Sequence, residues 1–503
     1  MGALRDSMKK RDFLKSGVAA VALGGPLSQL NAQNYPKPSK IERRNLLLIT
    51  ADDIDWSCIG FMTGREGITP NLDRLAARSH RFRQMRTSSP ICMPSRQAFM
   101  SGLRPHRNGG NGFFPMHEGT STITSRLSDA GWFTGATHKI KHMRPASSFP
   151  WNFKVEGKDR HPDLHARGLD LIIEEARAQY KPWFANCNIN DPHRPFYNSE
   201  AAIQMDHGQQ GAYKVENEFT ADDVTVPSNL EDLPEIREEI ARYWNSCQRF
   251  DKAVGNILRV LEESGEADNT VIVFISDHGM PLPFGKATCY DHGVRVPALI
   301  SYPGMAAPTD FDQLAINLDL HPTTLELMGV EATPDIDGRS LVPLMEGRTA
   351  QHRDMVMTHV DYVSSGYAYP MRGLQDERYT LLFTPWANSA LQLRIESMWG
   401  LTWPAMLEAA KTDPRMRARA DQYLNGVPLA LYDLKKDPGQ RVNLIDEPRY
   451  AKRAAAMKDR MLREMEQDGD PQYENFRLFL SGQQPIVVQE PASHRMAGFP
   501  DKD

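Results

Sequence analysis

The chain has 503 residues, of which 40% are hydrophobic and 24% are charged, so it is long enough for a globular protein with more than one domain. Its formal net charge of -5 gives no reason to expect nucleic acid as a partner, and attraction to an anionic ligand must come from a few local Lys, Arg and His side chains. The five cysteines show no CxxC or Cys/His spacing, which argues against a structural zinc site.

The N-terminal residues resemble an export signal. A basic segment at 9–15 (KKRDFLK) precedes a short apolar run at 17–23, which is too short to span a bilayer. The basic segment is similar to a twin-arginine signal, with Lys10 where the first arginine usually stands. We therefore predict a signal peptide over 1–33, a linker over 34–43, and an exported protein, periplasmic or secreted, with no membrane span. The alternative is a basic tail without a targeting role.

From residue 44 onward, short apolar runs alternate with helical patterns. Strands are predicted at 45–50, 183–189, 270–275 and 295–302, and helices at 70–81 and 236–261. The helix at 236–261 has the strongest support, because its apolar residues recur every three or four positions. Strands that alternate with helices predict a mostly parallel α/β sheet sandwiched by helices, which forms a large domain over 44–345.

The pattern changes after about residue 345. Strands are predicted within 371–383 and at 429–434, and a charged helical stretch lies between them at 405–423. We therefore predict a smaller C-terminal α+β domain over 346–468, followed by an irregular tail over 469–503.

Charged side chains stand directly after three of the predicted strands. Asp52 and Asp53 follow the first strand, residues 191–193 (Asp-Pro-His) follow the second, and Asp277 and His278 follow the third. Ligands of parallel α/β sheets collect at the carboxyl ends of strands, so we expect these side chains to meet. Carboxylates from two strand ends could hold a hard cation such as calcium. Because Asp-Asp pairs also cap helices and turns, this pattern alone leaves both interpretations open.

The segment Cys92-Met93-Pro94-Ser95-Arg96 is the most specific motif in the chain. It resembles the signature of the sulfatase family, in which a maturation enzyme oxidises the cysteine to formylglycine. Other segments resemble that family in the same order, namely 52–53 (DD), 101–105 (SGLRP), 276–279 (SDHG), 290–297 (YDHGVRVP) and 431–444 (LYDLKKDPGQRVNL). The resemblance therefore spans about residues 44–444, and it implies an alkaline-phosphatase-like fold.

The resemblance implies a nucleophile that is made by modifying Cys92. An aldehyde at this position would hydrate to a gem-diol. One hydroxyl of the diol attacks sulfur, and the other loses its proton and expels sulfate, which restores the aldehyde. A plain thiol lacks the second hydroxyl and cannot complete this cycle.

The same resemblance implies a calcium ion as cofactor. Its ligands would be Asp52, Asp53, Asp277 and His278 together with residue 92, and the cation would orient the diol and polarise the sulfate oxygens. His278 stands where most members of the family carry Asn, and imidazole is an unusual ligand for so hard a cation. Magnesium is the alternative, although flexible carboxylate-rich sites favour the larger ion.

Four further residues match catalytic or sulfate-binding positions of the family, and a fifth stands near one. By this resemblance Arg96 would hold the formylglycine hydrate, and Lys139 and Lys286 would bind sulfate as point charges. His193 would contact the sulfate and donate a proton to the leaving group. The motif around Lys139 is altered, because the usual preceding glycine is absent and the following histidine is displaced to His142. His142 is therefore a catalytic candidate without an assigned role.

The segments 191–196 and 277–286 resemble the heparan N-sulfatase branch, the N-sulfoglucosamine sulfohydrolases. These segments surround the sulfate and not the sugar, so the predicted substrate is a sulfated saccharide, and N- versus O-sulfate stays open. Loops at 143–165, 197–230 and 362–403 are expected to select the sugar. The oligomeric state also stays open.

Two other functions compete with the sulfatase interpretation. A phosphodiesterase or phosphonate hydrolase of the same superfamily acts on a similar tetrahedral anion, but purely phosphate-acting relatives usually carry Thr or Ser as nucleophile and bind two zinc ions. A secreted glycan-binding protein on an inactive sulfatase fold is disfavoured by the joint presence of Cys92, Arg96, His193 and the two lysines.

Overall fold

The computed structural model describes residues 43–157, 160–206, 213–387, 389 and 391–487. The predicted signal peptide, and the linker up to residue 42, lie outside the described residues. The central feature is an eight-stranded sheet with the strand order β5-β4-β6-β1-β7-β8-β2-β9. In that order the strands are β5 (Phe153–Val155), β4 (Phe133–Thr137), β6 (Trp183–Pro192), β1 (Asn45–Asp52), β7 (Thr270–Ser276), β8 (Ala298–Ser301), β2 (His80–Phe82) and β9 (Asp310–Phe311).

The strands in the middle of this sheet run parallel. β1 pairs in parallel with β6 and β7, and β4 pairs in parallel with β5 and β6. β8 is antiparallel to both β7 and β2. The prediction of a mostly parallel α/β sheet is thus confirmed, whereas the strand predicted at 295–302 is shorter and runs in the opposite direction.

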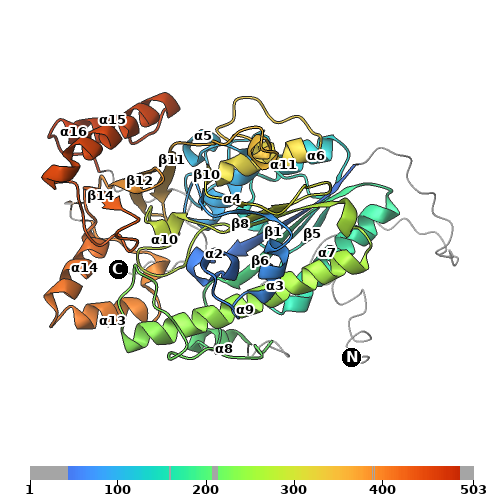
Figure 1. Ribbon diagram of the computed structural model, residues 1–503, viewed down its shortest axis with the longest axis horizontal. Helices are drawn as coiled ribbons and strands as arrows, with labels where there is room; N and C mark the ends of the chain where they lie inside the picture. Colours follow the sequence, from blue (N-terminus) through green and yellow to red (C-terminus); the bar gives the residue numbers. More distant parts are fainter. Residues whose placement is uncertain (1–42, 158–159, 207–212, 388, 390, 488–503) are drawn as a thin grey trace. The chain divides into compact units, whose positions relative to one another are not determined.

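Helices cover both faces of the sheet (Figure 1). One face carries α3 (Pro70–Ala76), α7 (Pro162–Ala178) and α9 (Pro234–Glu263), and the other carries α4 (Cys92–Ser101), α6 (Ile123–Asp129) and α11 (Leu320–Leu327). Side chains of a strand alternate between the two faces. Accordingly, Leu47 and Ile49 of β1 pack in the same core as α7 and α9, whereas Leu46 and Leu48 pack in the core of α6 and α11. Burial on both faces explains the continuous apolar run of this strand.

The helix predicted at 70–81 ends at Ala76, earlier than expected. Residues 80–82 form β2, in which Phe82 is fully buried and pairs with β8. Pairing at the edge of the sheet therefore replaces the last part of the predicted helix.

The other short elements of this part are η1 (Trp56–Cys58), α2 (Gly60–Thr63), β3 (Met85–Arg86), α5 (Pro105–Asn108), η2 (Ile140–His142), η3 (Ala146–Ser148), α8 (Glu200–Asp206), η4 (Ala267–Asn269), α10 (Asp291–Val294), β10 (Ala315–Ile316), η5 (Asn317–Asp319) and α12 (Val342–Met345).

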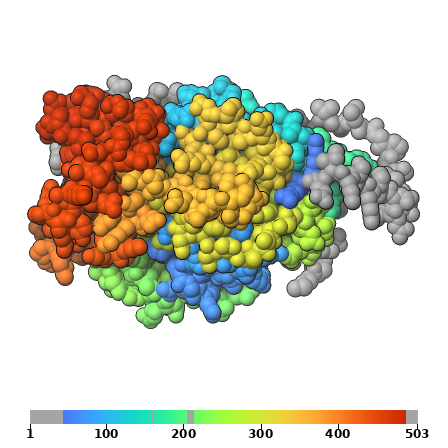
Figure 2. Space-filling model, turned by 45° about the horizontal axis from the view of Figure 1, so that its top comes forward, coloured from blue at the N-terminus to red at the C-terminus, as the bar shows by residue number. Residues whose placement is uncertain are grey.

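A second, four-stranded sheet follows in the C-terminal part, and all its strands are antiparallel. The strands are β11 (Val356–Tyr362), β12 (Ala368–Gln375), β13 (Tyr379–Phe383) and β14 (Leu429–Asp433). The helices of this part are η6 (Glu396–Met398), α13 (Thr402–Ala409), α14 (Pro414–Asn425), η7 (Pro448–Tyr450), α15 (Ala451–Asp468) and α16 (Tyr473–Leu480). Figure 2 shows the orange and red C-terminal segments gathered beside the yellow residues that precede them. The predicted small α+β unit is therefore present.

Two details of the C-terminal prediction are wrong. The helical stretch predicted at 405–423 is two helices, because Pro414 begins α14 and the Asp413 side chain caps it by accepting a hydrogen bond from the amide of Arg415 at 2.8 Å. The tail predicted to be irregular from 469 contains α16, whose buried Phe476 packs on Phe383 of β13.

A buried ion-pair network ties the end of α15 to the small sheet. Arg372 of β12 is fully buried, and it donates to Asp470 at 2.6 and 2.8 Å and to Asp361 at 2.9 Å. Removing one member of a buried pair leaves an uncompensated charge, which costs about 3–5 kcal/mol.

We therefore expect Arg372→Met to lower the free energy of unfolding by about 3–5 kcal/mol, measured from the shift of the urea midpoint. The matched control is Arg477→Met, which removes an exposed pair with Glu474 and should cost no more than about 1 kcal/mol. Equal shifts in the two variants would contradict a structural role for the buried network.

Candidate functional site

The carboxyl ends of β1, β6 and β7 meet at one edge of the sheet. Ala51 is in register with Ser276 of β7, and Asp52 is in register with Pro192 of β6. Parallel pairing therefore brings together the charged segments that follow these three strands, as the sequence predicts.

Asp53 turns its side chain out of the strand through a left-handed backbone conformation, with φ of 75°. The amide of Asp53 donates to Oδ1 of Asp277 at 3.1 Å, and its carbonyl oxygen accepts from the hydroxyl of Tyr243 at 2.8 Å. Non-glycine residues rarely adopt this conformation, so these two bonds offset a local strain. Asp52 and Asp53 thus both lie at the edge where the three strands end, and both are fully buried.

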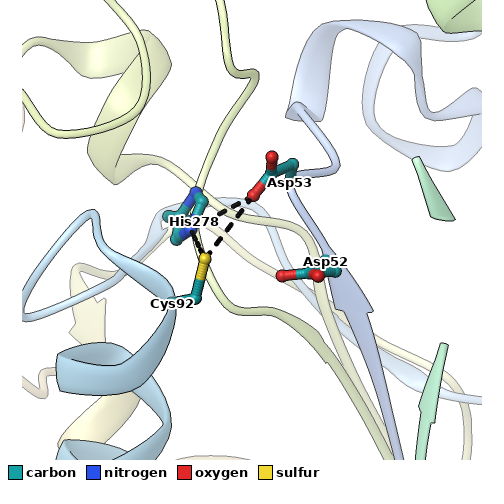
Figure 3. A group of neighbouring side chains, drawn as sticks. All are labelled: Asp52, Asp53, Cys92 and His278. Carbon is teal, nitrogen blue, oxygen red and sulfur yellow. Dashed lines mark hydrogen bonds and ion pairs between the residues drawn. The ribbon is translucent and has the colours of Figure 1, made fainter. Parts of the chain in front are cut away.

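Cys92 is the first residue of α4, and its side chain points toward His278 and lies beside these carboxylates (Figure 3). Its Sγ is 3.2 Å from Nε2 of His278 and 4.0 Å from Oδ1 of Asp53. Burial raises the pKa of the Cys92 thiol well above its ordinary value, although Lys286 opposes the rise. The thiol is therefore protonated at neutral pH and is a poor nucleophile as it stands.

Arg96 lies one turn further along α4 and binds all three central strands. Its Nε donates to Oδ2 of Asp277 at 3.0 Å, and its Nη1 donates to Thr50 at 2.8 Å and to Asn188 at 2.6 Å. Its Nη2 lies 3.5 Å from Oδ1 of Asp52. Arg96 is fully buried, so this residue fixes the position of α4, and hence of Cys92, relative to the sheet.

Two lysines pair with the two aspartates. Lys139, which follows β4, forms an ion pair with Asp52. Nζ of Lys286 lies 3.0 and 2.9 Å from the two carboxylate oxygens of Asp53. Burial alone would raise the pKa of Asp52, but Lys139, followed by His193 and Arg96, outweighs it and holds this pKa well below its usual range.

His193 also lies near Asp53, with its Nε2 4.0 Å from Oδ2 of that residue. Its Nδ1 lies 2.7 Å from the carbonyl oxygen of Arg194, so Nδ1 carries the proton and Nε2 presents a lone pair. Burial, together with Lys286, lowers the pKa of His193 to about 4. His193 is therefore neutral at pH 7, and an anionic group nearby is needed for it to gain a proton.

A cavity of about 940 Å³ opens over this cluster. Its lining includes Cys92, Lys139, His142, His193, Glu396 and Trp399. The structure thus brings His142 to the cavity although its motif is altered, and its ring packs on Phe113 with the ring centroids 5.6 Å apart. Nδ1 of His142 has no hydrogen-bond partner among the residues that the structure describes.

The residues present fit a hard metal cation. One ligand atom each from Asp52, Asp53, Cys92 and His278 lie within 4.8 Å of one another. Neither carboxylate oxygen of Asp52 accepts a well-formed hydrogen bond from the described part of the chain. Asp277 stands further back, because Arg96 binds its Oδ2 while its Oδ1 lies 3.7 Å from Nε2 of His278. Buried carboxylates that point at one another without enough donors are expected where a cation completes the charge balance.

Sequence reasoning missed two residues of the site. Asn188 accepts from Arg96 and donates to the carbonyl oxygens that precede Lys139, at 2.9 and 3.1 Å. The sequence signal for Asn188 is a polar residue inside a strand that is otherwise predicted to be buried. Glu396 of η6 pairs with Lys286 at 3.0 Å and lies 3.5 Å from His193. It lies within 362–403, a segment expected from the sequence to select the sugar, but no local signal marks the residue itself.

A buried cysteine that faces carboxylates, lysines and a histidine at a sheet edge defines an enzyme site for a small anionic group. Residues 44–330 match the sulfatase family model, and residues 277–390 match the model of the N-sulphoglucosamine sulphohydrolase C-terminal region. The chain therefore belongs to the sulfatase family, and it is a sulfuric ester hydrolase.

Individual proteins show the same likeness. Human N-sulphoglucosamine sulphohydrolase is 26% identical over 473 residues, which cover 85% of this chain and 91% of that protein. A protein solved in complex with its substrate D-glucosamine-2-N,6-O-disulfate has a TM-score of 0.64 at 19% identity, covering 85% of this chain and 99% of the other. The phosphonate monoester hydrolase of Agrobacterium radiobacter has a TM-score of 0.61 at 18% identity, covering 85% and 96%. The last two matches concern the fold alone.

Within the described ranges, none of the helices has the length and apolarity to cross a bilayer.

Proposed function

We propose that this protein removes sulfate, held as an O-ester or an N-sulfamate, from a sulfated glycan. The position of Cys92 carries the proposal. Its Sγ lies at the floor of the cavity beside His278 and Asp53, and Lys139 and His193 line the same cavity. A sulfate group placed beside Cys92 would meet the ammonium group of Lys139 and the imidazole of His193.

The proposed nucleophile is a formylglycine made from Cys92 by a maturation enzyme, and the proposed cation is calcium. When present, the hydrated aldehyde would supply one hydroxyl to attack sulfur and a second to expel sulfate, and calcium would acidify the diol and polarise the sulfate oxygens. The raised pKa of the Cys92 thiol supports the need for modification, because an unmodified thiol is protonated here.

The residues of this chain would then divide the remaining work. Asp52, Asp53, Asp277 and His278 hold the cation, as the converging ligand atoms suggest. Lys139 and Lys286 neutralise the sulfate, and Arg96 keeps residue 92 in place. His193 donates its Nε2 proton to the leaving atom once the anionic substrate has raised its pKa.

A sulfated saccharide is the proposed substrate because the cavity has the volume of a small-molecule site and opens between the α/β part and the C-terminal part. The likeness to the human N-sulphoglucosamine sulphohydrolase supports the same class. Export through the N-terminal signal is proposed with it, since extracellular glycans are then accessible.

The test is release of inorganic sulfate from a panel of N-sulfoglucosamine and 2-O- and 6-O-sulfated sugars, with phenylphosphonate monoester as the competing substrate. We expect sulfate from at least one sugar. Hydrolysis of the phosphonate without sulfate release from any sugar would overturn the proposal in favour of a phosphonate hydrolase.

Replacing His193 should affect poor leaving groups most. His193→Gln is expected to lower kcat/KM on the sulfated sugar by about 10²- to 10⁴-fold, because the leaving atom loses its proton donor. The loss on 4-nitrophenyl sulfate should be much smaller, because a nitrophenolate leaves without a proton. Equal losses on the two substrates, measured by sulfate release and by absorbance, would show that His193 only binds sulfate.

A further inference from the structure

Glu396 presents a buried carboxylate oxygen that lacks a donor. Its Oε2 accepts from Nζ of Lys286 at 3.0 Å, whereas Oε1 lies 3.5 Å from Nε2 of His193. Oε1 is buried and accepts no hydrogen bond from any residue that the structure describes. A buried acceptor without a partner costs about 1–3 kcal/mol, and more when it is charged, so such an atom needs an explanation.

The atom that faces Oε1 is also an acceptor. Because Nδ1 of His193 carries the ring proton toward the carbonyl oxygen of Arg194, Nε2 presents only a lone pair to Glu396. Lys286 and His193 outweigh burial and lower the pKa of Glu396 to about 2, so this carboxylate is ionised and can only accept. Two acceptors thus face each other across 3.5 Å in the wall of the cavity, and a ligand that brings a hydrogen to this place would give Glu396 the donor it lacks.

The chemistry of the two kinds of sulfate group differs at this place. In a sulfamate the atom that joins sulfur to the sugar is a nitrogen that carries one hydrogen. In a sulfate ester that atom is an oxygen that carries none, and its lone pairs are repelled by a carboxylate. Glu396 contacts both His193, the proposed proton donor to the leaving atom, and Lys286, a proposed sulfate-binding residue, so a joining atom within reach of Nε2 of His193 would also lie near Oε1.

We propose that Glu396 is the specificity-determining residue that selects N-sulfated over O-sulfated amino sugars, by accepting a hydrogen bond from the sulfamate N–H. This inference rests on the proposed sulfatase function and narrows its substrate class. A site that is built to bind a substrate N–H rejects the analogue without it by up to about 10⁴-fold, because its polar group is left unpaired. The competing explanation is that Glu396 only positions Lys286.

The test compares two sugars that differ only in the joining atom, namely N-sulfoglucosamine and glucose 2-O-sulfate. For the wild-type enzyme we expect kcat/KM for the sulfamate to exceed that for the ester by about 10²-fold or more. In Glu396→Leu this ratio should fall by about 10- to 100-fold, which corresponds to one hydrogen bond to a charged group. Glu396→Gln keeps an acceptor oxygen, so its ratio should fall less.

Lys286 would contact the sulfate of both sugars, so a purely positioning role of Glu396 would lower both rates equally and leave the ratio unchanged. Such an unchanged ratio overturns the inference. The control variant is Glu408→Gln, an exposed residue of α13 that should keep the wild-type ratio. Thermal unfolding and the peptide mass at residue 92 are measured for each variant, so that misfolding and incomplete maturation are recognised.

The two proposals fail in distinguishable ways. Wild-type enzyme that prefers glucose 2-O-sulfate refutes the selection by Glu396 and leaves the sulfatase function intact. Matured wild-type enzyme that releases sulfate from no sugar refutes the proposed function, and the inference with it.

Discussion

Cys92→Ala is expected to lower kcat/KM for sulfate release by about 10⁴-fold or more, the size of effect seen when a covalent nucleophile is removed. Cys92→Ser should be as inactive, although serine fits the same space at the start of α4. Neither alanine nor serine has the thiol that the proposed maturation step oxidises to the aldehyde. The single hydroxyl of serine cannot both attack sulfur and expel sulfate.

The measurement combines sulfate release with the peptide mass around residue 92, in protein produced with the maturation enzyme. Active protein should carry the mass in which sulfur and two hydrogens are replaced by one oxygen. Cys289→Ser is the control, because this buried thiol lies 3.7 Å from the carbonyl oxygen of Met371 and a hydroxyl can donate the same bond. Full activity of Cys92→Ser, or an unmodified thiol in fully active protein, would refute the formylglycine mechanism.

Much of the site could be predicted because it is built from local sequence signals at strand ends. The runs that form β1 and β7 are apolar on both faces, and polar residues mark where each strand leaves the core. Parallel pairing then forces Asp53 and Asp277 together, whatever the loops do. Cys92 and Arg96 are one helical turn apart, so their joint approach to the sheet also follows from sequence.

What could not be predicted depends on contacts between distant segments. Glu396 reaches the cavity from a loop of the C-terminal part, and nothing in its neighbours marks it as a partner of His193. The division of 405–423 into two helices differs from this case, because one capped proline, Pro414, is a local signal for it. The same holds for α15, where Met457, Met461 and Met465 recur every four residues on its buried face.

The charge pattern of the site poses a specific question about the lysines. The sequence resemblance implies that Lys139 and Lys286 bind sulfate, yet each is paired with an aspartate that the same resemblance makes a metal ligand. A divalent cation held by Asp52 and Asp53 would compete with the two ammonium groups for these carboxylates. The freed ammonium groups would then face the cavity, where an anionic substrate binds. Metal binding and sulfate binding are thus coupled through the two lysines in the proposed mechanism.

Removal of calcium is therefore expected to abolish activity and to lower thermal stability together. A ligand at 100 times its Kd stabilises the folded state by about 2.7 kcal/mol, so adding calcium to chelator-treated protein should raise the unfolding temperature. Asp53→Asn should lose this increase and lower kcat/KM by about 10²-fold or more, since even outer partners of metal ligands are worth up to that factor. Asp310→Asn removes a surface carboxylate that pairs with Arg81 and should keep the full response.

The outcome of this experiment separates the metal from the lysines. If Asp53 only pairs with Lys286, calcium will shift neither wild type nor Asp53→Asn, and activity will survive the chelator. If the ion is held as proposed, wild type alone gains the shift, and magnesium gives a smaller one because the carboxylate-rich site favours the larger cation. The unfolding temperature is read without substrate, so the metal can be assigned even before a sugar is identified.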